Sequence, residues 1–287
     1  MQLPRDETLQ ALLRDLYLND SSVDPEVLSS QLLQTLRGSA KEGDGLAVDE
    51  RWSGADAVLI TYADTVTEKE RPGLQSLRRL VNRHLNSFAS VIHVLPFLRS
   101  TSDGGFAVSS HDQLESRHGD WDDLCALSEG RRLMADLVLN HISASHPWVQ
   151  QFLCDEEPGC SCVLEAAPSP CWDAVVRPRS SSLFTQLRGP SGVRQVWTTF
   201  GPDQVDVDWR SPEVLLGFTR LLARMVRHGV RWVRLDAVGF IWKTPDTGCI
   251  HLPQAHSIVE VLRHLMDAAC SSGVVVTETN VPEQENL

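Results

Sequence analysis

The chain has 287 residues, of which 42% are hydrophobic and 22% charged, a composition that is ordinary for a globular protein. Its formal net charge of −12 argues against nonspecific binding to nucleic acid or to an anionic membrane, since both reward a basic surface. The N-terminus lacks a signal-peptide pattern, and no apolar run approaches the length of a membrane span. Seven cysteines at irregular spacings fit a reducing compartment better than a disulfide framework, so we expect a cytoplasmic protein.

The first 142 residues show a pair of amphipathic helices and then alternating strands and helices. Apolar side chains at helical spacing predict two helices between about Asp6 and Arg37, separated by a polar turn at Asn19–Ser22. Strands are predicted at Ala57–Tyr62, Ser90–Pro96 and Leu133–Leu139, with helices near Leu74–Leu85 and Trp121–Glu129 between them. This alternation is typical of βαβ units, in which helices join parallel strands.

The pattern changes between about Ser143 and Gln204, where Pro, Gly, Ser, Cys and Asp replace any sustained period. An irregular stretch of this length inside a compact domain is usually a functional insertion. Regular structure returns with a helix that Ser211 caps and Pro212 begins. A strand at Val230–Asp236, a helix near Ser257–Ala269 and a strand at Val274–Glu278 follow.

We therefore predict an α/β fold, a (β/α)8 TIM barrel that is incomplete here, with about five βα units and an irregular insertion after the third strand. Polar residues recur at the carboxyl ends of the predicted strands, where such barrels build their active sites. A doubly wound sheet is disfavoured because no glycine-rich phosphate-binding fingerprint follows the first strand. The predicted organisation is an N-terminal helical segment at 1–50, the first part of the barrel at 51–142, an inserted loop domain at 143–205 and the barrel continuation at 206–287, truncated after the fifth strand.

Two charged strand ends carry the clearest chemical signal. Arg234 and Asp236 lie two residues apart on one strand, so their side chains point to the same face. An arginine beside a carboxylate keeps that carboxylate ionised, which suits a nucleophile. Glu278, at the end of the next strand, can supply a proton donor, and two carboxylates are the minimum for glycoside chemistry. A structural ion pair is the alternative interpretation, although two charges on an otherwise apolar strand are costly without a function.

Other candidate residues follow the second and third predicted strands. Asp103 opens the sequence Asp-Gly-Gly-Phe, which is either a plain turn or a site with Phe106 as a stacking floor. His141 closes a segment that begins at Asp136, and each of these two is either a site residue or a buried, satisfied side chain. The cysteine cluster in the insertion lacks the paired knuckles of a zinc site, so we expect no metal.

In this order on consecutive strands, the motifs resemble those of the α-amylase superfamily of retaining glycoside enzymes, and within it the sucrose-phosphorylase branch. The segments that carry the resemblance are Asp136–His141, Gly229–Lys243 and Thr277–Asn280, with closer signatures at Val176–Arg179, Thr198–Asp206, Cys249–Gln254 and Thr277–Pro282. The closer signatures are most similar to the glucosylglycerate phosphorylase and sucrose 6-phosphate phosphorylase groups. The resemblance runs from about Tyr62 to the last residue and implies a barrel of the α-amylase type.

The resemblance implies phosphorolysis of an α-glucoside, sucrose-like or glucosylglycerate-like, by two displacements at the anomeric carbon. Asp236 would be the nucleophile that forms a β-glucosyl-enzyme, Glu278 the acid and then the base, and Arg234 the residue that orients the nucleophile. Phosphate, the co-substrate, would release α-glucose 1-phosphate. The enzyme would be a glycosyltransferase of the disaccharide phosphorylase type, with no metal and no organic cofactor.

The resemblance also implies two groups of substrate-binding residues. The glucose would be held by Asp103, Phe106, His141 and Gln204, and the acceptor side would be lined by Arg177, Arg179, Phe240 and Lys243. Guanidinium groups suit phosphate and carboxylate, although a solvated Arg-Pro-Arg loop is the alternative for the two arginines. The implied partners are a small sugar and phosphate, with neither nucleic acid nor membrane, and no oligomeric state is predicted.

Family members continue with further βα units that include a His-Asp pair for glucose binding, and the segment Val281–Leu287 resembles the start of the next loop. We therefore expect this chain to be inactive or very weak on its own. Two alternatives stay open, namely a hydrolase or transglucosidase that uses the same intermediate, and a noncatalytic amylase-like scaffold that pairs with a partner. The scaffold is disfavoured because such proteins normally lose the carboxylates that Asp236 and Glu278 supply here.

Overall fold

A five-stranded parallel sheet forms the centre of the protein, in a computed structural model that describes residues 6–37, 51–85 and 88–279. Its strands are β1 (Val58–Thr61), β2 (Val91–Val94), β3 (Arg132–Val138), β8 (Val230–Asp236) and β9 (Val274–Thr277), adjacent in that order. The predicted parallel sheet is confirmed. Because all five strands run the same way, their carboxyl ends meet along one edge. The predicted next-loop segment Val281–Leu287, like residues 38–50, lies outside the described residues.

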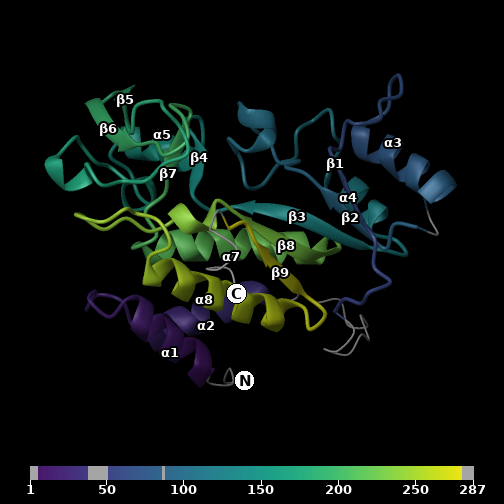
Figure 1. Ribbon diagram of the computed structural model, residues 1–287, viewed down its shortest axis with the longest axis horizontal. Helices are drawn as coiled ribbons and strands as arrows, with labels where there is room; N and C mark the ends of the chain where they lie inside the picture. Colours follow the sequence, from purple (N-terminus) through teal and green to yellow (C-terminus); the bar gives the residue numbers. More distant parts are fainter. Residues whose placement is uncertain (1–5, 38–50, 86–87, 280–287) are drawn as a thin grey trace.

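Helices α7 (Pro212–Arg227) and α8 (Pro253–Ala269) lie along the sheet and pack on β8 and β9 (Figure 1). Helices α3 (Gly73–Leu80), which continues into a π-helical turn, and α4 (Trp121–Leu127) pack on each other near β1 and β2. Two further helices, α1 (Glu7–Leu16) and α2 (Pro25–Leu36), pack outside α8 and α7. The N-terminal helices therefore form an outer layer on the helices of the sheet.

Local sequence explains where α1 and α2 begin. The carboxylate of Asp6 accepts a hydrogen bond from the backbone N–H of Leu9, and that of Asp24 caps α2 in the same way. The Asp6 carboxylate also lies 2.6 Å from Nε2 of His264 on α8, which ties α1 to the helix beneath it. The predicted pair of N-terminal helices is confirmed by these elements.

The insertion is more ordered than its composition predicts. It contains two antiparallel pairs, formed by β4 (His141–Ser143) with β7 (Gln204–Asp206) and by β5 (Phe184–Gly189) with β6 (Gly192–Trp197). Short helices α5 (Pro147–Leu153) and α6 (Gly159–Cys162) complete it, and all these elements gather at one end of the molecule (Figure 1). The expectation of irregular structure throughout this segment is therefore wrong, because β4 and β7 pair residues that are about sixty positions apart and leave no local pattern.

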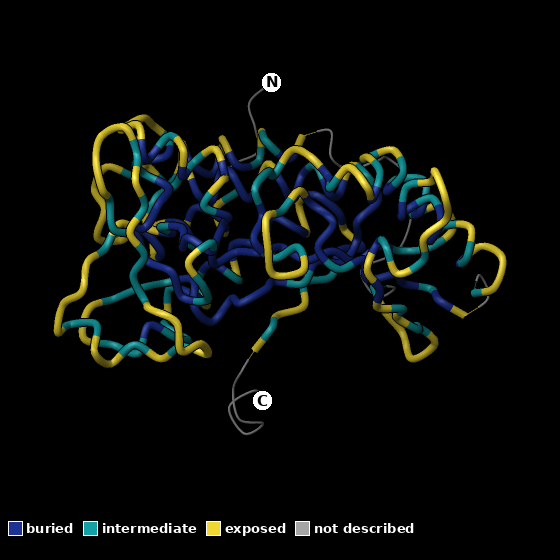
Figure 2. Tube along the Cα trace, turned by 90° about the horizontal axis from the view of Figure 1, so that it is seen from above, coloured by how far each residue is buried: buried dark blue, intermediate teal, exposed yellow. Residues whose placement is uncertain are grey.

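The two faces of the sheet differ in what they bury. The helix-covered face belongs to the main apolar core, and Figure 2 shows buried residues concentrated along the middle of the molecule. On the other face, Val91, Met134 and Trp232 form a small apolar layer with Val274. Polar side chains follow this layer at the carboxyl ends of the strands. Within the described ranges, no helix combines the length and apolarity needed to cross a membrane.

Candidate active site

Arg234 forms the centre of a charged cluster at the carboxyl edge of the sheet. Its Nη1 atom donates to Oδ1 of Asp236 at 2.8 Å and to Oδ1 of Asp136 on β3 at 2.5 Å. Its Nη2 atom lies 3.0 Å from Oε1 of Glu278, which directly follows β9. Asp136 and Arg234 are register partners across β3 and β8, so strand pairing alone brings them together. One guanidinium therefore joins the two carboxylates that the sequence singles out.

The turn after β8 fixes the second carboxylate. The backbone N–H of Ala237 donates to Oε2 of Glu278 at 2.8 Å. Ala237 has a positive φ of 53°, an uncommon conformation for a residue with a Cβ, so the chain turns sharply directly after Asp236. Glu278 thus has one oxygen on Arg234 and the other on the turn that follows Asp236, which keeps its carboxylate beside that of Asp236.

The surroundings of Asp236 raise the pKa of its carboxyl group. Burial and the charge of Glu278 raise the pKa of Asp236 to about 7, although Arg234 opposes this. Arg234 acts in the direction that the sequence predicts, but this single cation is shared among three carboxylates, so its role in keeping Asp236 ionised stays a prediction. Near neutral pH, Asp236 is therefore present in both its ionised and its protonated form.

The cluster extends to two residues that sequence reasoning left out of the site. Asp136 has a fully buried side chain, and its Oδ2 atom lies 2.9 Å from Nε2 of His93 on β2. The sequence marks Asp136 near the end of a predicted strand but does not single out His93. Their link to Arg234 depends on the pairing of β2, β3 and β8, which the sequence of any one strand does not contain.

The structure brings together three of the residues expected to hold glucose. The amide Nε2 atom of Gln204 donates to Oδ2 of Asp103 at 2.8 Å and lies 3.0 Å from Nε2 of His141. Burial lowers the pKa of His141 to about 4, so its ring is neutral at pH 7 and can accept this hydrogen bond. The three side chains come from the loop after β2, from β4 and from β7, and they offer several donors and acceptors in one place.

Aromatic rings lie beside this polar group. Phe200 contacts the ring of His141, with centroids 5.1 Å apart, and makes an edge contact of 5.5 Å with Phe240. Phe106 closes the turn that contains Asp103, since its N–H donates to the carbonyl of Asp103 at 3.1 Å. Phe106 and Phe240 therefore lie close in structure to residues that the sequence assigned to glucose, and their contacts with a sugar remain predictions. Phe200, which the sequence does not single out, contacts both His141 of the predicted glucose-binding group and Phe240 of the predicted acceptor group.

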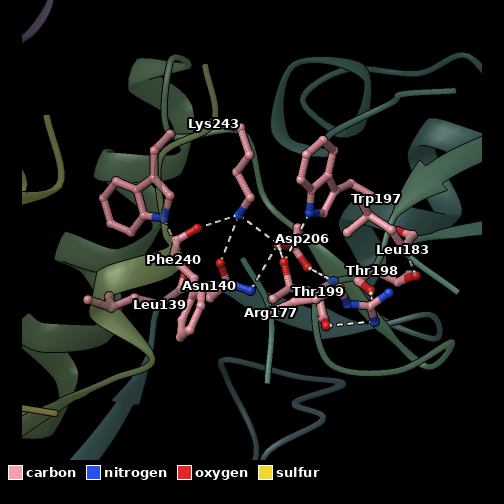
Figure 3. Close-up of polar contacts among 11 residues, drawn as sticks. Leu139, Asn140, Arg177, Leu183, Trp197, Thr198, Thr199, Asp206, Phe240 and Lys243 are labelled. Carbon is pink, nitrogen blue, oxygen red and sulfur yellow. Dashed lines mark hydrogen bonds and ion pairs between the residues drawn. The ribbon is translucent and has the colours of Figure 1, made fainter. Parts of the chain in front are cut away.

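Lys243 has a different setting from the acceptor site that the sequence predicts. Figure 3 shows its ammonium among the carboxylate of Asp206, the amide oxygen of Asn140 and the carbonyl of Phe240, at 2.6, 2.8 and 2.6 Å. The Lys243 side chain is only 5% exposed and that of Asp206 is fully buried. The ammonium is thus occupied by protein ligands, and Lys243 links the turn after Asp236 to the insertion.

Asp206 satisfies the rest of its carboxylate within the protein. It accepts hydrogen bonds from the backbone N–H and the hydroxyl of Thr199, at 2.9 and 2.6 Å, and from Nδ2 of Asn140 at 2.9 Å. Trp197 in turn donates its indole N–H to the Thr199 hydroxyl at 3.0 Å (Figure 3). Sequence reasoning quoted Asp206 only as part of a motif, and its buried partners give it a structural role.

The two arginines expected on the acceptor side differ in their surroundings. Arg177 donates to the carbonyl of Thr199 at 2.9 Å (Figure 3). It also donates to the hydroxyl of Ser181 at 3.0 Å and contacts the carbonyl of Ser181. Arg179 is exposed and has no hydrogen bond or ion pair with any described residue. Arg177 is therefore largely committed to holding its own loop, whereas Arg179 has a guanidinium that is open to an anion.

Comparisons with known proteins identify relatives of this chain. The model of the α-amylase catalytic domain matches residues 88–287. A glucosylglycerate phosphorylase of Allomeiothermus silvanus is 44% identical over 82% of this chain and 42% of its own length, and one of Escherichia coli is 40% identical over 90% and 46%. This chain thus spans less than half the length of these relatives.

The fold is similar as well. The crystal structure of sucrose 6F-phosphate phosphorylase from Thermoanaerobacter thermosaccharolyticum matches with a TM-score of 0.73 at 23% identity, covering 82% of this chain and 50% of that one. The five-stranded sheet corresponds to part of a barrel of this type, which confirms the predicted fold class. Because the family model matches well over half of the residues, the chain belongs to the α-amylase family.

Proposed function

We propose that the protein is a retaining glycoside phosphorylase that transfers glucose from an α-glucoside, glucosylglycerate-like or sucrose-like, to phosphate. One observation carries the proposal, namely that the carboxylates of Asp236 and Glu278 contact the same guanidinium, that of Arg234, at adjacent strand ends. Retaining glycoside chemistry needs such a close pair, in which one carboxylate attacks and the other donates a proton. The named phosphorylases among the relatives support the choice of phosphate as acceptor.

In the first step, a carboxylate oxygen of Asp236 attacks the anomeric carbon and the bond to the leaving oxygen breaks. Glu278 gives its proton to that oxygen, so the leaving group departs as a neutral hydroxyl. In the second step, a phosphate oxygen attacks the same carbon, the bond to Asp236 breaks and Glu278 takes up the phosphate proton. The product is α-glucose 1-phosphate, and the two inversions retain the configuration of the anomeric carbon.

The substrate contacts are proposed from the groups that the structure gathers. Asp103, His141 and Gln204 offer hydrogen bonds to glucose hydroxyls, with Phe106 nearby. Arg179 is the open cation for phosphate or for an anionic acceptor, and Arg177 supports its loop. A small sugar and phosphate would be the only partners, with no nucleic acid, membrane, metal or organic cofactor. The seven free cysteines fit a protein of the reducing cytoplasm.

The test is product analysis on the protein at its natural length. Glucosylglycerate and sucrose are each incubated with and without phosphate, and glucose and α-glucose 1-phosphate are measured. We expect α-glucose 1-phosphate only when phosphate is present. Equal release of free glucose under both conditions would replace the proposal with a hydrolase, and an absence of turnover with every donor would favour the noncatalytic scaffold.

A variant of Arg179 tests whether this residue binds phosphate. Arg179→Ala should raise the KM for phosphate by about tenfold or more while leaving the hydrolysis of the glucosyl-enzyme unchanged. Arg188→Ala is the matched control, because Arg188 is an exposed arginine on β5 of the same insertion. An equal loss of phosphorolysis and hydrolysis in Arg179→Ala would contradict a role in binding phosphate.

A further inference from the structure

The turn that carries Asp103 has an unusual backbone. Three consecutive residues have positive φ angles, with values of 55° at Asp103, 60° at Gly104 and 109° at Gly105. Glycine adopts this region freely, but it is costly for Asp103 because of its Cβ. Gly105 lies so close to the preceding loop that an added Cβ would come within 2.7 Å of the carbonyl oxygen of Pro96. Such a turn persists only when contacts from outside hold it in place.

Asp203 supplies these outside contacts. Its Oδ2 atom accepts hydrogen bonds from the hydroxyls of Thr101 and Ser102, at 2.6 and 2.5 Å, directly before the turn. Its Oδ1 atom accepts from the hydroxyl of Ser143 at 3.2 Å and from the backbone N–H of Ala144 at 3.3 Å. One carboxylate therefore joins the loop after β2 to the end of β4, in the insertion.

The next residue along the chain holds the other side of the same turn. Gln204 donates to the carboxylate of Asp103 itself. Asp203 and Gln204 are adjacent, so the chain at the start of β7 contacts both the hydroxyls that precede Asp103 and the Asp103 side chain. The partners of the Asp203 carboxylate in the described part of the chain are three hydroxyls and the N–H of Ala144. The Ala144 N–H also donates to the backbone carbonyl of Asp203 at 3.0 Å, so removal of the carboxylate mainly removes the contacts with the hydroxyls.

We propose that Asp203 is a positioning residue that holds Asp103 in the conformation that binds the glucose hydroxyls. This inference rests on the proposed role of Asp103 in glucose recognition. Asp203 does not touch the sugar. Its carboxylate holds the hydroxyls of Thr101 and Ser102 and so restrains the turn that carries Asp103. The restrained turn keeps Asp103 within hydrogen-bond distance of Gln204.

A double-mutant cycle between Asp203 and Asp103 tests the proposal. The variants Asp203→Ala, Asp103→Ala and the double variant are compared with the wild type by the dissociation constant of glucose, measured by calorimetry, and by the KM and kcat for the glucosyl donor. We expect Asp203→Ala to weaken glucose binding and raise the donor KM about tenfold. In the Asp103→Ala background, the same substitution should have an effect of less than twofold, because the residue through which it acts is gone.

Two further variants separate positioning from a general loss of structure. Asp203→Asn should recover part of the affinity, since its amide oxygen can still accept from Thr101 and Ser102. Asp208→Ala is the matched control, because Asp208 follows β7 and, among the described residues, its carboxylate accepts hydrogen bonds from Arg210 alone, three in number. We expect this control to leave glucose binding unchanged. The proposal would be overturned if Asp203→Ala and Asp208→Ala weakened glucose binding equally. It would also be overturned if Asp203→Ala weakened glucose binding by the same factor in the Asp103→Ala background as in the wild type.

The experiment stays decisive if Asp203→Ala unfolds or if turnover is absent. Thr101→Val and Ser102→Ala each remove one donor to the Asp203 carboxylate without deleting its charge, and both should weaken glucose binding in the same direction. Unchanged binding in both variants would count against Asp203. Glucose binding needs no phosphorolysis, so the cycle can succeed even if no α-glucose 1-phosphate forms, an outcome that would reject the proposed function and leave the positioning role intact.

Discussion

The molecule contains two clusters of charged side chains, one partly and one fully buried, and their charges are balanced in opposite ways. In the first, the guanidinium of Arg234 serves three carboxylates, those of Asp136, Asp236 and Glu278. In the second, the ammonium of Lys243 faces the single carboxylate of Asp206, and neutral donors satisfy what remains of that carboxylate. The first cluster has a deficit of positive charge, whereas the second has none.

The difference separates a reactive site from a structural link. A deficit of cations leaves room for a proton, and this is why burial and Glu278 can raise the pKa of Asp236 to about 7. A balanced and fully hydrogen-bonded pair has no such freedom and serves only to hold two segments together. The Arg234 cluster should therefore control activity and the Lys243 cluster should control stability.

The largest expected effect is on activity, in the Arg234 cluster. Asp236→Asn should lower kcat for α-glucose 1-phosphate formation by at least about 10³-fold, because the amide cannot attack the anomeric carbon. The measurement is steady-state phosphorolysis by the protein at its natural length, with Asp208→Asn as the folded control. A variant that retains near-wild-type turnover would remove Asp236 from the role of nucleophile.

The next effect is on stability, in the Lys243 cluster. Lys243→Met should lower the free energy of unfolding by about 3–5 kcal/mol, because it leaves the buried carboxylate of Asp206 without its cation. Adding Asp206→Asn should restore much of the loss, since the pair is then neutral. Urea denaturation measures both, and Lys69→Met is the control because its side chain is 92% exposed. A double variant as unstable as the single one would show that charge balance is not what this cluster provides.

The sequence predicts the first cluster far better than the second. The strand Val230–Asp236 is predicted to the residue, and strict alternation along it places Arg234 and Asp236 on one face. The end of β9 places Glu278 beside them through regular parallel pairing. These features depend on local patterns and on one general rule of sheet geometry, so a single sequence contains them.

The second cluster depends on contacts between distant residues in irregular segments. Lys243 and Asp206 are separated by a helix and a strand, and nothing near Lys243 shows that its ammonium is buried. The same holds for Arg177, whose partners are backbone carbonyls that become neighbours only when the insertion folds. The start of α8 at Pro253, four residues before the predicted Ser257, is by contrast a local error, because proline is favoured in the first turn of a helix.

A third prediction uses the raised pKa of Asp236 to test whether the Arg234 cluster, unlike the Lys243 cluster, holds a proton. The folded protein keeps a proton on Asp236 between about pH 4 and pH 7, whereas the unfolded chain releases it, so this group destabilises the fold as the pH rises through that range. Asp236→Asn should therefore increase the free energy of unfolding by about 2 kcal/mol at pH 8 and have little effect at pH 4. An equal change at the two pH values would mean that the Arg234 cluster does not hold the proton.

The smallest predicted effect concerns a buried histidine outside both clusters. Burial lowers the pKa of His146, whose Nδ1 atom accepts the backbone N–H of Trp148 at the start of α5. The unfolded chain binds a proton at His146 below about pH 6.5 and the folded one does not, so this group lowers stability as the pH falls, by about 1 kcal/mol per pH unit. His146→Ser keeps a capping oxygen and removes the titration. Urea denaturation between pH 7.5 and pH 5 should therefore show a shallower pH dependence for the variant than for the wild type, whereas equal slopes would show that His146 does not titrate on unfolding.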